Sequence, residues 1–87
     1  MNKIPSIQGK VVEYYTRRAV PSAVVIVNNR TTLTDQAGRF SMDVPLGPLT
    51  IKVTHRQFYD CITSLNITVP TAYDIGTITL QSKVRAL

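Results

Sequence analysis

Apolar and polar side chains alternate with a period of two along much of the chain. Leu49, Ile51 and Val53 alternate with two threonines and a lysine, and the segment from Phe40 to Val44 repeats the pattern. A β-strand points successive side chains to opposite faces of a sheet, so each of these segments has one apolar face and one polar face. The pattern predicts strands and leaves no segment for a helix.

The turn residues between these segments support the same interpretation. Asp35 and Gly38 flank a tight hairpin, in which the carboxylate accepts backbone N–H groups and the glycine adopts a positive φ. A second turn, Pro45 to Pro48, keeps proline out of the strand interiors. Eight short segments have this pattern, near residues 7–14, 23–27, 31–34, 40–44, 49–54, 59–63, 65–69 and 75–81, and they predict about seven strands.

The composition and length favour one all-β domain. One residue in three is valine, isoleucine or threonine, the β-branched types that pack well on a pleated surface. Eighty-seven residues suffice for a single core. Strands with one apolar face each bury those faces best as two stacked sheets. We therefore expect residues 1–87 to form one seven-stranded antiparallel Greek-key β-sandwich, with its core in residues 7–80 and loosely held ends.

The sequence around the predicted hairpin resembles that of carboxypeptidase regulatory-like domains, which have a transthyretin-like (prealbumin-like) sandwich. Residues 32–47, TLTDQAGRFSMDVPLG, are similar to the signature of that family, and the likeness extends over residues 7–80. Ser22 and Gln57 depart from it, because the family usually has glycine at both positions, and those turns are expected to differ locally. The resemblance implies a non-catalytic accessory or assembly module, usually attached to something larger.

The residues themselves do not indicate an enzyme. The chain has one histidine, His55, and one cysteine, Cys61, and its five carboxylates are spread over distant segments. His55 and Cys61 could form a catalytic imidazole and thiol pair. The preferred interpretation is that Cys61 packs in the core and His55 is a solvated turn residue. The spacings typical of metal sites are missing. No catalytic residue, metal ligand, cofactor site or small-molecule substrate is predicted.

The second predicted strand, residues 23–27, is apolar at every position, although a half-exposed strand should alternate. If alternate residues enter the core, Val24 and Ile26 face outward, beside Val12 and Tyr14 of the first strand. A contiguous apolar stripe on a surface usually marks a protein interface. These four residues are the predicted contact surface for a protein partner or for a second copy of the chain.

Charge suggests an alternative function. The formal net charge is +5, which attracts nucleic acid or another polyanion at low salt. The basic residues are scattered in the sequence and no aromatic pattern or nucleic-acid motif accompanies them. The candidates for anion contacts are Arg17, Arg18, Arg30, Arg56, Lys83 and Arg85.

A carbohydrate-binding accessory role is a second alternative, because sugars stack on aromatic rings and the chain has four tyrosines but no tryptophan. The sequence also lacks an apolar leader and any stretch long enough to span a membrane. Together with the single Cys61, this favours a cytoplasmic protein, unless the chain is an excised extracellular module.

Overall fold

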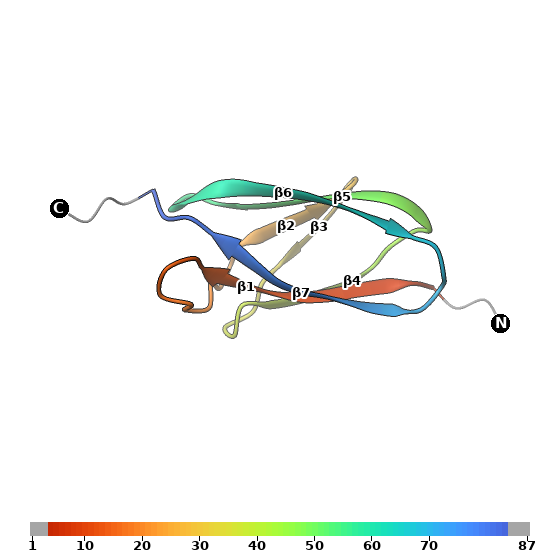
Figure 1. Cartoon of the computed structure of the whole chain (residues 1–87), viewed down its shortest axis with the longest axis horizontal. Helices are drawn as coiled ribbons and strands as arrows, with labels where there is room; N and C mark the ends of the chain where they lie inside the picture. Colours follow the sequence, from red (N-terminus) through yellow and green to blue (C-terminus); the bar gives the residue numbers. More distant parts are fainter. Residues whose placement is uncertain (1–3, 84–87) are drawn as a thin grey trace.

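Seven strands form two facing sheets in the computed structural model, which describes residues 4–83 (Figure 1). No helix occurs among these residues, so the described chain has no helical segment that could cross a membrane. The all-β sandwich predicted from the sequence is confirmed. The strands are β1 (Ser6–Glu13), β2 (Val24–Val27), β3 (Arg30–Leu33), β4 (Arg39–Asp43), β5 (Gly47–His55), β6 (Phe58–Ile67) and β7 (Ala72–Leu80).

The two sheets are unequal in size. One has three strands in the order β4-β1-β7, and the other has four in the order β3-β2-β5-β6. Neighbouring strands are antiparallel except β1 and β7, which run parallel, so the expectation of a wholly antiparallel sandwich is wrong for this pair. A parallel pair requires a long crossover connection, and here the other five strands supply it.

The strand boundaries follow the alternating pattern closely. The largest difference lies in β6, where the segments predicted at 59–63 and 65–69 form one strand from Phe58 to Ile67. Serine at position 64 faces away from the core in this strand, opposite Thr50 of β5. A polar residue there continues the alternation and does not interrupt the strand.

Alternate aliphatic residues of both sheets fill the space between the layers. Leu49, Ile51 and Val53 of β5 are each about as fully buried as a side chain can be, at 1% exposure, as their spacing predicts. Phe40 of β4 is buried as well, and it lies opposite Gly9 of β1. A Cβ atom at Gly9 would come within 2.9 Å of the Phe40 ring, so the glycine makes room for that ring.

The hairpin before β4 has the predicted chemistry. The carboxylate Oδ1 of Asp35 accepts the N–H groups of Ala37 and Arg39, both at 2.9 Å. Gly38 has a φ of 75°, in the left-handed region that L residues avoid. Its carbonyl oxygen accepts the N–H of Val11 at 2.7 Å, which fastens the turn to β1.

Ser22 also lies in the left-handed region, with a φ of 59°. The turn before β2 therefore keeps the backbone conformation that glycine would adopt most easily. Ser22 therefore adopts, at a steric cost, a backbone conformation that glycine adopts freely.

Candidate interaction surface

Four apolar side chains lie on the outer face of the four-stranded sheet, the face turned away from the core. Val24 of β2 pairs with Leu33 of β3, and Ile26 of β2 pairs with Lys52 of β5, which in turn pairs with Ile62 of β6. Residues paired across antiparallel strands share one face of the sheet. Leu33 and Ile62 are 58% and 64% exposed, and the other two are half-buried. We call Val24, Ile26, Leu33 and Ile62 the outer apolar face.

One ion pair crosses this surface. The Nζ atom of Lys52 lies 3.7 Å from a carboxylate oxygen of Asp60. Lys52 lies between Ile26 and Ile62 in the row of paired residues. The described residues of the outer apolar face thus lie on either side of one lysine, whose ion pair is directed toward β6.

The outer face of the three-stranded sheet has a different character. Gln8 pairs there with Ser41, and Lys10 pairs with Arg39. A shallow hollow on this face is lined mainly by polar residues, including Asp35 and those four. Exposed apolar residues of the sheets thus gather on the four-stranded side, where their contact with water is unfavourable in free energy.

The structure separates the four residues predicted as an interface. Sequence reasoning placed the first strand beside the second, but β1 pairs with β4 and β7 in the other sheet. Val12 is only 5% exposed and cannot contribute to a docking surface, and Tyr14 lies in the loop after β1. Val24 and Ile26 do lie together on the outer apolar face. The other apolar residues of this face are Leu33 and Ile62, and not Val12 and Tyr14 as expected.

Sequence reasoning missed Leu33 and Ile62 because each looked unremarkable within its own strand. The Asn28-Asn29 turn joins β2 to β3 and sets the register in which Val24 faces Leu33. From this short turn the sequence could have predicted that Leu33 lies beside Val24. Ile62 lies on the same face because β5 and β6 are joined at 56–57, a register that the sequence pattern alone does not specify.

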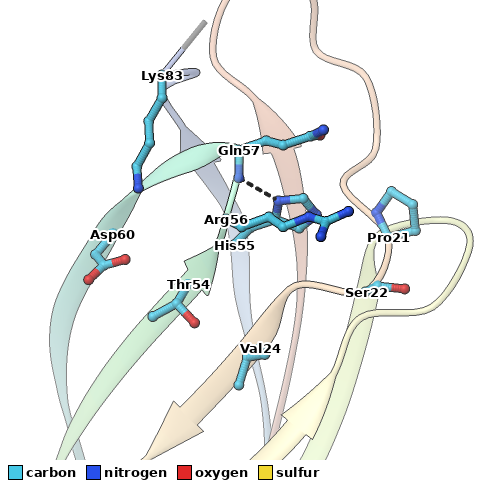
Figure 2. Close-up of a pocket in the computed structure, with 9 residues that line it drawn as sticks. All are labelled: Pro21, Ser22, Val24, Thr54, His55, Arg56, Gln57, Asp60 and Lys83. Atoms are coloured by element: carbon cyan, nitrogen blue, oxygen red, sulfur yellow. Dashed lines mark hydrogen bonds between the residues drawn. The ribbon is translucent and has the colours of Figure 1, made fainter.

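Basic residues gather at one end of the sandwich, where the β1–β2 loop, the β5–β6 turn and the end of β7 meet. Arg56, Lys83 and His55 are among the residues that line an open hollow of about 770 Å³ (Figure 2). Arg18 lines an adjoining hollow beside the same histidine, and Arg17 precedes it in the loop. We call Arg17, Arg18, Arg56 and Lys83 the basic end. Val24 lines the larger hollow too, so the basic end adjoins the outer apolar face.

The remaining predicted anion contacts do not join this group. Arg30 begins β3, beyond the β2–β3 turn, and its Nη1 atom donates to the carbonyl oxygen of Asp43 at 3.2 Å. Arg85 lies outside the described residues. Of the six predicted basic residues, Arg18, Arg56 and Lys83 therefore line two adjoining hollows at one end, and Arg17 is next to Arg18 in the loop.

An acidic residue supports the loop that carries two of the arginines. The Oε2 atom of Glu13 accepts the N–H of Thr16 at 2.6 Å and the hydroxyl of the same residue at 3.1 Å. The Thr16 N–H holds the pKa of the Glu13 carboxyl below its ordinary value, with a smaller contribution from the charge of Arg17. Glu13 thus fixes the start of the loop while it stays ionised.

The tyrosines do not form a flat platform for a sugar ring. Tyr14 and Tyr15 are neighbours in the β1–β2 loop, but their rings meet edge to face at 85°. Tyr59 lies under the ammonium group of Lys83, 5.9 Å from the ring centroid. Tyr73 is half-buried, and its hydroxyl oxygen accepts the N–H of Val69.

His55 and Cys61 occupy different environments. The Nδ1 atom of His55 accepts the N–H of Gln57 at 3.1 Å, shown as the dashed line in Figure 2. Cys61 pairs with Val53 and faces the core side of its sheet, where it lines a different hollow. Within residues 4–83 no three His, Cys, Asp or Glu side chains are grouped so that they could hold a metal ion.

Comparisons with solved structures show the same fold in several larger proteins. A chain of a mutant type II Cohesin-X-Dockerin complex from Acetivibrio cellulolyticus is 20% identical, with a TM-score of 0.72, and the match covers 95% of this chain and 61% of that one. The present chain therefore spans about three fifths of that chain.

Two other structures contain the fold as a smaller part. A putative membrane-associated protein from Bacteroides fragilis NCTC 9343 is 16% identical with a TM-score of 0.70, over 98% of this chain and 30% of its own. A 9R-lipoxygenase from Cyanothece PCC8801 is 18% identical with a TM-score of 0.62, over 88% and 16% of the two chains. At such identities the likeness concerns the fold alone.

No curated protein sequence matches the chain. The model of one family does match, that of the carboxypeptidase regulatory-like domain, over residues 6–81. This range contains all seven strands and agrees with the resemblance seen in residues 7–80. The chain belongs to the carboxypeptidase regulatory-like domain family, whose fold is a transthyretin-like β-sandwich.

Proposed function

We propose that this domain is a non-catalytic interaction module that binds a protein partner through the outer apolar face. The observation that carries the proposal is the alignment of Val24, Ile26 and Leu33 with Ile62 on one open sheet face. Exposed apolar groups that lie together are uncommon on soluble domains unless they serve an interface. The matched Cohesin-X-Dockerin chain is itself part of a protein complex, which agrees with an assembly role.

The surroundings of this face favour a particular kind of partner. Protein interfaces commonly combine an apolar centre with a charged or polar rim. Here the basic end forms one part of the rim and meets the apolar face at Val24. A partner that presents an apolar patch bordered by acidic residues would match both features, and the charges would also accelerate the encounter at low salt.

Site-specific photo-crosslinking in the native host tests this proposal. A photoreactive amino acid at Leu33 or Ile62 should give an adduct with one protein, identified by mass spectrometry. The same amino acid at Gln8 or Ser41, on the polar face of the other sheet, should not give that adduct. Absence of any adduct specific to Leu33 and Ile62 would refute the proposal, while an adduct between two copies would identify the partner as a second copy.

A double substitution provides the matched variant. Val24→Lys with Ile26→Lys places charges on the outer apolar face and should abolish the adduct, because lysine ammonium groups would have to be desolvated in the interface. Gln8→Lys with Ser41→Lys adds the same charge to the opposite face and should leave the adduct unchanged. Unfolding curves of both variants establish that the fold survives.

A second candidate function rests on the basic end. Arg17, Arg18, Arg56 and Lys83 converge from three connections, so the scattered sequence positions form one patch. A patch of this kind can bind a polyanion such as DNA or heparin through phosphate or sulfate groups. Binding should fall steeply as salt rises, and replacing Arg18, Arg56 and Lys83 by serine should reduce the salt dependence. Absence of a gel shift at low salt would exclude this candidate.

A further inference from the structure

The inner side of β6 is only partly covered, because the opposite sheet has one strand fewer. Register places three residues of β6 on the same core-facing side as three fully buried residues of β5. The β5 residues are each 1% exposed, whereas their partners on β6 keep contact with solvent. The pairs are Leu49 with Leu65, Ile51 with Thr63, and Val53 with Cys61.

A groove of about 420 Å³ lies along this uncovered side, between β6 and β7. Ile51 and Ile78 belong to the buried core and form its floor, and the half-buried Leu65, Tyr73 and Ile75 line its walls. Figure 1 shows β6 and β7 in different layers, joined beyond the groove by residues 68–71. At the other end the two strands converge, where a bridge links Phe58 to Ser82.

The groove is bordered by two sheet edges. β6 and β7 are each the last strand of their sheet, and they are 10 and 9 residues long, compared with 4 and 5 for the opposite edges, β3 and β4. Among the described residues, β6 bonds to the chain after β7 at one end, where the Tyr59 N–H donates to the carbonyl oxygen of Gln81 at 2.9 Å. The backbone N–H and C=O groups along the rest of β6 and β7 are positioned to pair with another strand.

The edge of β6 lacks the features by which proteins protect such edges from pairing. It contains no proline and no lysine, and Asp60 is its one charged residue. Its register with β5 is regular from Cys61 to Ile67. The edge of β7 is less suitable, because the register shifts near Gly76, which has a φ of 80°. A strand added to this side is therefore expected on β6.

We propose that the groove between β6 and β7 binds an extended segment of a partner protein, which pairs with β6 at residues 61–67 as an added strand. Main-chain hydrogen bonds supply affinity in this mode of recognition, and alternate side chains supply specificity. Every second side chain of the segment enters the groove and contacts Leu65, Tyr73 and Ile75. These side chains are apolar and of the size of valine or leucine.

Charge further defines the segment. The groove lining includes no lysine or arginine, although basic residues outnumber acidic ones two to one in the chain. Asp74 lies at its β7 border, between the groove and the outer face of the three-stranded sheet, and its Oδ1 atom accepts the N–H of Gly76 at 2.8 Å. A segment with a lysine or arginine near Asp74 is therefore favoured over an acidic one. The groove lies on the core-facing side of β6, whereas Ile62 lies on the opposite side of the same strand, so Val24 and Leu33 of β2 and β3 are the residues that tell the two proposals apart.

A short peptide is the probe. We would use a capped peptide, Lys-Val-Thr-Val-Thr-Val-Lys, whose length of about seven residues matches residues 61–67. Cys61 lines the groove and is the one cysteine of the chain, so its alkylation rate reports occupancy. At a peptide concentration about ten times the dissociation constant, alkylation should slow about tenfold. Backbone amide resonances of residues 61–67 should shift in the same titration.

Two variant peptides serve as controls. Replacing the central valine by proline removes a hydrogen-bond donor and should abolish protection of Cys61. Replacing both lysines by glutamate should weaken binding, because the glutamate at the end nearer Asp74 would be repelled by that carboxylate. Equal protection by the proline peptide, or no protection by the parent peptide at concentrations near 1 mM, would overturn the proposal.

Protein variants separate the groove from the rest of β6. Thr63 is exposed and faces the groove, so Thr63→Lys should reduce peptide affinity at least about tenfold. Asn66 is exposed on the opposite side of the strand, so Asn66→Lys should leave the affinity unchanged. Amide shifts confined to Val24 and Ile26 would overturn the proposal. So would protection of Cys61 that grows with protein concentration alone, because the occupant would then be a second copy.

Discussion

The hydroxyl of Thr34, directly after β3, donates a 2.6 Å hydrogen bond to the carbonyl oxygen of Val20, which precedes β2. The hydroxyl oxygen of Thr34 in turn accepts the N–H of Ala23 at 2.8 Å. Thr34 is the buried polar side chain of the described core, and the two residues it contacts are themselves buried. One side chain therefore satisfies two backbone groups that the turn before β2 leaves without strand partners.

Replacement of Thr34 by valine should destabilise the domain by about 2 to 3 kcal/mol, because it preserves shape but leaves two buried backbone groups unpaired. Chemical denaturation followed by circular dichroism measures the free energy of unfolding. Thr34→Ser keeps the hydroxyl and should lose much less. A larger loss for Thr34→Ser than for Thr34→Val would show that the methyl group, and not the hydrogen bonds, matters most at this position.

Gly38→Ala should destabilise the domain more than Gly76→Ala. Both glycines have a positive φ, 75° and 80°, so alanine is strained at either position. At Gly38 the added Cβ would also lie 2.5 Å from the carbonyl oxygen of Val11, whereas nothing lies within 4 Å at Gly76. We expect a loss of about 1 kcal/mol at Gly76 and at least about 2 kcal/mol at Gly38. Similar midpoints in urea for the two variants would contradict the contact with Val11.

Ser22→Gly should stabilise the domain by up to about 1 kcal/mol. Ser22 has a φ of 59°, which a glycine adopts without the steric cost that a Cβ atom imposes. Thermal unfolding would show a higher midpoint for Ser22→Gly. Ser22→Ala retains the Cβ atom and should show no gain, so a gain in both variants would assign the effect to the serine hydroxyl.

The pH dependence of stability should contain a contribution from Glu13. Its pKa is lowered in the folded state, chiefly by the Thr16 N–H, so ionised Glu13 favours folding. A lowered folded pKa contributes stability that is present above the unfolded value, about 4.3, and is lost as pH falls through the folded value. The difference in thermal midpoint between the native protein and Glu13→Gln should therefore shrink as the pH is lowered below about 4. A difference independent of pH would contradict this role.

Local pattern determined much of the fold. The period of two in residues 49–54 identified which side chains of β5 enter the core, because a strand has no other way to bury one set of residues. Asp35 and Gly38 predicted the hairpin for a similar reason, because its hydrogen bonds lie within five residues of sequence. Val24 and Ile26 were recognised as outward-facing because their strand is apolar throughout.

Tertiary structure decided which strands are neighbours. Alternation orients side chains but does not determine pairing, so the sequence could not exclude Val12 from the outer apolar face or bring Ile62 to it. The convergence of Arg18, Arg56 and Lys83 likewise depends on three connections that meet at one end. The groove beside β6 arises because one sheet has three strands and the other four, a consequence of pairing between residues far apart in the chain.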